Sequence, residues 1–166
     1  MALRVLIYGK NFIALCALTS RLTQGDKKLS IMKKDIIIPQ VENVYVAAVQ
    51  EWNDDFMQKT WYAYLVNDGD FDLESVLVVS NASGIIDGEE RKTSMLRHAF
   101  VKVEGVSVVK IELIEDSVLV LDNSFMVTFF IGNTLYDKNY VFKAGTINEN
   151  NTVEVPILFK EGVMIG

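Results

Sequence analysis

The sequence predicts an all-β protein, an antiparallel β-sandwich of the immunoglobulin- or fibronectin-like type with about eight strands. Half of the 166 residues are hydrophobic, which is enough to build the core of one domain. From Glu42 onward, short apolar runs alternate with turn residues at roughly 8–12-residue intervals. No stretch beyond residue 31 repeats with a helical period over three turns. A partly open barrel is the alternative.

The first predicted strands lie between residues 44 and 79. Residues 44–49 are apolar on both alternating faces, as expected of a strand that is covered on both sides. Residues 61–66 and 73–79 are rich in aromatic and β-branched side chains, which favour strands. The sequence Asn-Asp-Gly-Asp at residues 67–70 separates these two runs and predicts a hairpin turn.

A polar segment, residues 80–94, is expected to connect the first strands to the later ones. The later predicted strands are residues 95–104, 106–114, 125–131, 139–144 and 153–158. Residues 139–144 are expected to pair with residues 125–131. Pro156 has no N–H to donate to a strand ladder, so the last strand is predicted at a sheet edge or at a bulge.

The charge distribution changes at Met32. Residues 1–31 hold five basic residues and one acid, whereas residues 32–166 hold 11 basic and 21 acidic residues. The sequence Met-Lys-Lys-Asp at residues 32–35 is typical of a bacterial translation start. We therefore expect a folded domain at 32–166, with 1–31 either a mis-assigned start or an extension that forms a strand and a short helix.

The composition of the chain excludes several classes of function. The acidic domain is unsuited to phosphate backbones and to anionic membrane surfaces, so we expect neither nucleic acid nor membrane as a partner. No apolar run reaches the roughly 18–20 residues of a membrane span. Cys16 is the only cysteine, which excludes an internal disulfide and favours a cytoplasmic location.

A basic segment stands out in this acidic domain and is the main candidate binding site. Its residues are Arg91, Lys92, Thr93, Ser94, Arg97 and His98. Arginine and hydroxyl groups can together hold an anion or a protein partner. The alternative is that Arg91 and Lys92 only pair with the neighbouring glutamates. If the segment is a strand, Arg97 and His98 point to opposite faces. Trp52 and Phe56 are candidate surface anchors for a protein partner.

Catalytic and metal motifs are absent from the sequence. His98 is the only histidine, and no serine has the surroundings of a nucleophile elbow. The acidic run that starts at Asp68 lacks the glycine and glutamate of a calcium loop. Gly9 follows an apolar run, but a dinucleotide site needs three glycines. We therefore expect no metal and no cofactor, and the sequence favours a non-enzymatic role over an enzyme.

Four segments carry a resemblance to known proteins. They are residues 32–35, 42–47 (Glu-Asn-Val-Tyr-Val-Ala), 51–53 (Glu-Trp-Asn) and 91–98 (Arg-Lys-Thr-Ser-Met-Leu-Arg-His). With them the chain resembles, over residues 32–166, a group of short bacterial proteins, some of which are labelled phenylalanyl-tRNA synthetase alpha subunit. The resemblance implies an accessory role in tRNA aminoacylation. It supplies no catalytic residues, because the longer catalytic core and ATP site of a class II synthetase have no counterpart here.

These observations together predict a protein-interaction module that binds another protein, with a homodimer left open. Residues 153–158, at a predicted edge, are a candidate site for strand addition. The alternatives are a small-molecule or anion-binding protein, or an enzyme, that uses the segment from Arg91 to His98, and the accessory role in tRNA aminoacylation.

Overall fold

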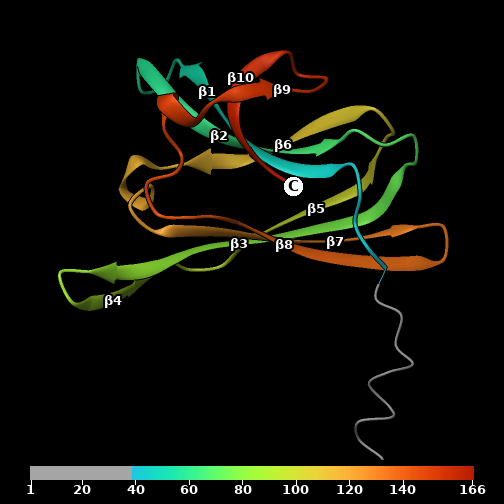
Figure 1. The fold of residues 1–166 in the computed structure, drawn as a ribbon, viewed down its shortest axis with the longest axis horizontal. Coiled ribbons are helices and arrows are strands. Elements are labelled where there is room, and N and C mark those ends of the chain that lie inside the picture. The colour runs from blue at the N-terminus through green and yellow to red at the C-terminus, as the bar shows by residue number, and fades with distance from the viewer. Residues whose placement is uncertain (1–38) are drawn as a thin grey trace, which may run out of the picture. The chain divides into compact units, whose positions relative to one another are not determined.

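The computed structural model describes residues 39–166, in which two antiparallel β-sheets pack face to face (Figure 1). This confirms the predicted all-β, sandwich-like class. The expectations for residues 1–31 and for a start at Met32 lie outside the described residues. Within residues 39–166, no helix is long and apolar enough to cross a membrane.

The first sheet, sheet A, has the strand order β6-β2-β1-β10-β9. Its strands are β1 (Val44–Asn53), β2 (Gln58–Asn67), β6 (Ser107–Ile114), β9 (Val153–Val155) and β10 (Lys160–Ile165). The strands β1 and β2 form a hairpin, and β10 pairs with the other side of β1. The predicted edge is confirmed, because β9 ends at Val155, directly before Pro156, and lies at the end of the sheet.

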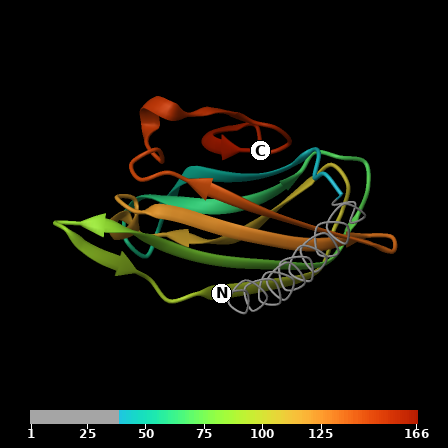
Figure 2. The ribbon, with the colours of Figure 1, turned by 60° about the horizontal axis from the view of Figure 1, so that its bottom comes forward.

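The second sheet, sheet B, is organised around one long strand, β3. Its strands are β3 (Leu73–Ile86), β4 (Glu89–Lys92), β5 (Leu96–Val103), β7 (Asp122–Ile131) and β8 (Thr134–Phe142). Both β4 and β5 pair with the same side of β3, and β7 pairs with its other side and with β8. The hairpin of β3 and β4 projects at the left of both ribbon views (Figures 1 and 2).

The main core lies between the two sheets. Val46, Ala48 and Leu65 of sheet A face Val78 and Phe125 of sheet B, and all five side chains are buried. A buried hydrogen bond also crosses the core, because Tyr140 Oη on β8 donates to the Val44 carbonyl on β1 at 2.7 Å. Burial of the Tyr140 phenol raises its pKa, so the group stays a donor at any ordinary pH.

A second apolar cluster covers the other face of sheet A. Ala47 and Val49 on β1 and Val66 on β2 pack with Val155, the last residue of β9, and with Ile157 in the turn that follows. The expectation that residues 44–49 are covered on both faces is therefore confirmed. Gly162 on β10 permits this close packing, since a Cβ there would lie 2.7 Å from the Ala48 carbonyl oxygen.

Several expectations about the strands are wrong. Residues 80–94 are not a polar connection, because β3 continues to Ile86 and returns as β4. The chain turns at Asp87 and Gly88, which both have positive φ angles of 53° and 81°. The described residues form ten strands rather than about eight, because neither β4, whose sequence is polar, nor β10 is predicted from the sequence. The predicted last strand also divides into β9 and a turn before β10.

The Asn-Asp-Gly-Asp segment at residues 67–70 is not a hairpin, because β2 and β3 lie in different sheets. The Asn67 side chain donates to the carbonyls of Phe71 and Glu104, both at 2.8 Å. The Asp72 carboxylate accepts from the Gly105 backbone N–H and from Lys102. These turn residues therefore form a corner where the chain passes from one sheet to the other. Hydrogen bonds of Asn67 and Asp72 connect this corner to the turn between β5 and β6.

Candidate ligand-binding site at the end of β6

A β-bulge separates β4 from β5. Ser80 is paired with Leu96 and Ser83 with Lys92, so one more residue lies between the paired positions on the β4–β5 side than on β3. Within the bulge, Thr93 Oγ1 accepts from the Ala82 backbone N–H at 2.8 Å, and the Thr93 N–H donates to the Ala82 carbonyl. The bulge keeps the two short strands on one edge of β3 while it turns Thr93 and Ser94 out of the regular ladder.

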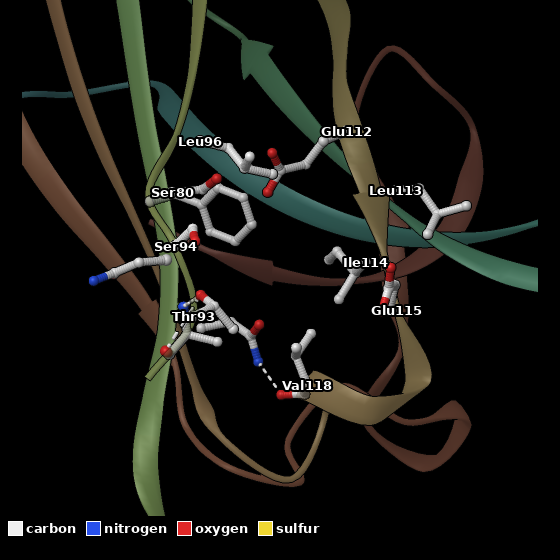
Figure 3. A pocket seen from close by; sticks show the side chains of 13 residues that line it. Ser80, Thr93, Ser94, Leu96, Glu112, Leu113, Ile114, Glu115 and Val118 are labelled. Atoms are coloured by element: carbon white, nitrogen blue, oxygen red, sulfur yellow. Dashed lines mark hydrogen bonds between the residues drawn. The ribbon is translucent and has the colours of Figure 1, made fainter. Parts of the chain in front are cut away.

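The bulge faces the end of β6 across a cavity of about 230 Å³, here called the first cavity (Figure 3). Ser80, Thr93 and Ser94 lie on one side of it, and Ile114, Glu115 and Val118 lie on the other. Val118 belongs to a 3₁₀ turn, η1 (Asp116–Val118), that follows β6. The Asn123 side chain on β7 donates to the Val118 carbonyl at 2.8 Å, and so holds this wall in place.

The polar groups of the first cavity are unusual in two ways. Ser80 is 3% exposed, and its Oγ has no hydrogen-bond partner among the described residues. Buried hydroxyl groups are normally hydrogen-bonded, so this one lacks a partner that a ligand or water could supply. Glu112 also lines the cavity, and its side chain is 13% exposed. Glu112 Oε2 lies 2.5 Å from His98 Nε2, which fixes the carboxylate between the two sheets.

A second cavity of about 290 Å³ lies on the other side of the same segment. It shares Leu113, Ile114 and Glu115 with the first cavity, and this shared segment is here called the β6 corner. Thr60 lines the second cavity, is 5% exposed, and its Oγ1 has no partner in the described part of the chain. Each side of the β6 corner therefore carries one buried hydroxyl group without a hydrogen bond.

The turn between β1 and β2 places an aromatic side chain at the second cavity. Asn53 Oδ1 accepts the backbone N–H groups of Asp55 and Phe56, at 2.9 and 3.2 Å, and this Asx turn fixes the loop. Phe56 lines the second cavity and is 61% exposed. Trp52 is also exposed, and its indole N–H donates to Asp54 at 3.0 Å, but it does not line this cavity.

Only some residues of the predicted basic segment lie at the first cavity. Thr93 and Ser94 line the first cavity, and His98 reaches it through Glu112. Arg91, Lys92 and Arg97 are exposed and line neither cavity, and Arg91 pairs with Glu89 at 2.7 Å.

Strand pairing shows which way these side chains point. Arg97 lies opposite Val79 and His98 opposite buried Val78, so the two point to different faces of β5. The segment therefore does not gather its cations at one place.

Sequence reasoning missed the residues that complete the site. Ser80, Thr60 and Glu112 belong to ordinary strand patterns and carry no motif. The packing of one sheet on the other brings Ser80 and Glu112 to one cavity, and the bulge opposite residues 81 and 82 adds Thr93 and Ser94 to it. A single-residue bulge leaves no clear trace in hydrophobic periodicity. The adjacent Thr-Ser pair at the end of a charged run was the one available signal.

The charge of the site is negative. Glu112 and Glu115 line the first cavity, Glu115 and Asp116 line the second, and neither cavity has a Lys or Arg in its lining. Residues 39–166 hold 9 Lys and Arg against 20 Asp and Glu, so the wider surface adds to this potential. In the described residues, no three His, Cys, Asp or Glu side chains come together as metal ligands would.

Another charged cluster lies on the outer face of sheet A and has a structural explanation. Glu51 on β1 accepts hydrogen bonds from Lys110 on β6 and Lys160 on β10, and Lys110 Nζ lies 3.9 Å from the Tyr62 ring centroid. Burial alone would raise the pKa of Glu51, but the two lysines outweigh it and lower the pKa to about 2. The cluster ties three strands of one sheet together.

Comparison with known proteins adds no relative to this description: no family model, no curated protein and no solved structure matches the chain.

Proposed function

We propose that this chain is a non-enzymatic interaction module that binds a segment of another protein across the β6 corner. The observation that carries the proposal is the pair of cavities that meet at Leu113, Ile114 and Glu115, each with a buried hydroxyl that lacks a partner. Drug-sized ligands occupy pockets of roughly 300–1,000 Å³. Cavities of about 230 and 290 Å³ suit single side chains of a bound segment better than a whole cofactor.

The surroundings of the corner support a protein ligand. Phe56 and Met57 are 61% and 72% exposed beside the second cavity, and Leu96 is 52% exposed beside the first. Exposed apolar side chains next to small cavities are typical of surfaces that bind peptides. In addition, β6 lies at the edge of sheet A, so its outer backbone groups can pair with an added strand.

We further propose that the sandwich is of the immunoglobulin- or fibronectin-like type. Its pairings support this: β1 with β2 and β2 with β6 match strands A, B and E, and β3 with β7 and β7 with β8 match strands C, F and G. The β9–β10 hairpin is then an addition beside strand A. Many extracellular and intracellular domains of this type bind proteins, which favours the proposed function only by analogy. The single cysteine supports a cytoplasmic location.

The alternatives make different demands on the surface. An anion site at the segment from Arg91 to His98 would need its cations together, and Lys92 and Arg97 lie outside both cavities. A role in tRNA aminoacylation predicts tRNA binding that weakens steeply with salt. A homodimer through the β6 corner predicts concentration-dependent self-association that a blocked corner abolishes.

Selection from a random heptapeptide library on the full-length chain tests the proposal. We expect selected peptides to bind the chain and to lose about tenfold or more of their affinity for Ser94→Trp, in which an exposed rim residue is enlarged to fill the first cavity. Thr134→Trp, at the exposed first residue of β8, which lines neither cavity, is the matched control. Failure to select any peptide, or equal binding by both variants, would overturn the proposed function.

A further inference from the structure

We infer that the first cavity takes a basic side chain, a lysine or arginine, from the bound segment. This inference rests on the proposed function for the identity of the partner, but the charge preference of the cavity can be tested by itself. Two carboxylates, Glu112 and Glu115, line the cavity, and no Lys or Arg lines it. A cationic group would therefore meet favourable potential on entry, whereas a carboxylate or phosphate would be repelled.

Glu112 is positioned to receive the cation. His98 occupies only Oε2 of its carboxylate, and in the described residues Oε1 takes no side-chain hydrogen bond. Glu115 at the outer rim is exposed and provides longer-range attraction. A carboxylate that is 13% exposed and held by a neighbour has lost most of its freedom before binding, so little entropy is lost when a donor reaches it.

The unpartnered hydroxyl supplies a second acceptor for the same group. Ser80 Oγ is buried in the cavity wall, and Figure 3 shows Ser80 and Glu112 on the same, upper part of the cavity. An ammonium has three donors and a guanidinium has five, so either can serve a carboxylate and a hydroxyl at once. An anionic ligand could use the hydroxyl but would leave Glu112 facing a like charge.

The remaining walls fit the aliphatic part of such a side chain. Leu96, Ile114, Val118 and Phe125 supply apolar surface in the same cavity. Lysine and arginine bury their methylene stems along apolar surfaces while the charged end reaches polar partners. Together, the apolar walls, the buried hydroxyl and the fixed carboxylate specify a long cationic side chain rather than a short polar one.

Small probes test the charge preference directly. The full-length ¹⁵N-labelled chain is titrated with n-butylammonium and, as the anion of similar size, with butyrate. We expect saturable shifts of the Ser80, Thr93 and Ser94 amide signals with n-butylammonium and none with butyrate. Glu112→Gln should weaken n-butylammonium binding about tenfold or more, and Ser80→Ala should weaken it several-fold. Glu90→Gln, an exposed carboxylate on β4 that lines neither cavity, should leave binding unchanged.

The two proposals fail in different ways. Equal shifts with butyrate, no saturable shift with n-butylammonium, or undiminished binding in both Glu112→Gln and Ser80→Ala would overturn the basic-side-chain inference. If peptides are selected at the β6 corner but replacement of each Lys or Arg by Gln leaves their affinity unchanged, the protein-binding function stands and the inference falls. If no peptide is selected but n-butylammonium binds as expected, the site prefers cations and the protein-binding function falls.

Discussion

His98 on β5 and Glu112 on β6 join the two sheets through side chains, with His98 Nε2 and Glu112 Oε2 2.5 Å apart. The two strands are consecutive in the chain but belong to different sheets. The pair thus closes one side of the sandwich next to the first cavity. Its side chains are only 28% and 13% exposed, so solvent screens the interaction less than it screens a surface pair.

A double-mutant cycle on this pair should show real coupling. We expect His98→Ala and Glu112→Ala to have an interaction free energy of about 1 kcal/mol in urea unfolding, because each single change removes the hydrogen bond and leaves the partner's polar group largely buried without it. The pair of Arg91 and Glu89, at 59% and 71% exposure, is the control and should show a coupling near zero. Equal coupling in the two cycles would mean that His98 and Glu112 do not hold the sheets together.

The unpartnered hydroxyls should cost stability rather than add to it. We expect Ser80→Ala to be neutral or to raise the free energy of unfolding by up to about 1 kcal/mol, since no hydrogen bond is lost and a buried polar group is removed. Thr60→Val should behave in the same way.

Thr93→Val is the matched control for the hydroxyl replacements. It should destabilise by about 1 kcal/mol because the Thr93 hydroxyl bonds the Ala82 backbone. Urea unfolding of the three variants checks both expectations. Clear destabilisation by Ser80→Ala would show that its hydroxyl is already satisfied, which would remove the main sign of an unfilled site.

Acid should weaken the Glu51 cluster. The pKa of Glu51 is about 2 in the folded chain and near 4.5 for a free side chain, so the folded state binds its proton less readily. The cluster therefore contributes stability above about pH 4.5 and loses it as the pH falls toward 2. Because both lysines are half exposed, we expect the contribution to be on the order of 1–2 kcal/mol.

The measurement is the difference in unfolding free energy between the natural chain and Glu51→Gln. It should be largest near neutral pH and shrink as the pH approaches 2. Asp72 and Asp122, whose pKa values are lowered by Lys102 and Lys143, are unchanged in both proteins, so their titration cancels in the difference. A difference that is constant over this range would contradict the lowered pKa of Glu51.

Gly162→Ala should strongly destabilise sheet A. A Cβ at this position would lie 2.7 Å from the Ala48 carbonyl oxygen and 2.8 Å from Val49 Cγ2, both in the packed centre of the sheet. We expect a loss of about 2–4 kcal/mol in thermal or urea unfolding. Gly69→Ala is the control, because its Cβ would meet only ordinary contacts at 3.5 Å and beyond, and we expect a change within about 0.5 kcal/mol.

Much of the fold could be predicted because the alternation of apolar residues along the sequence indicates where strands lie. The doubly covered strand β1, the pairing of β7 with β8 and the edge position before Pro156 all follow from local patterns. The turn at residues 67–70 shows the limit of such patterns. Its residues favour a reversal of the chain. They do not determine whether the next strand pairs with the previous one or crosses to the other sheet, as β3 does.

The candidate site could be predicted only in part. Thr93 and Ser94 were chosen for their place in a basic segment, and they line the cavity for a different reason, namely the bulge beside them. Ser80 and Glu112 come from strands in different sheets, and their proximity depends on the packing of one sheet on the other. Trp52 and Phe56 are both predicted as surface anchors, and both are exposed, yet only Phe56 lines one of the two cavities of the β6 corner.

The pairing of β1 with β10 has a consequence for the order of events during synthesis on the ribosome. At ~5–20 residues per second, β10 leaves the ribosome several seconds after β1 and β2. During this interval the hairpin of β1 and β2 can form, but the edge of β1 that later receives β10, and the apolar face that Val155 later covers, have no partner from the chain. During this period the unpaired strand edge and the uncovered apolar face of sheet A are open to aggregation or to chaperone binding. Sheet B is exposed for a shorter time, because all of its strands have been synthesised once β8 has emerged.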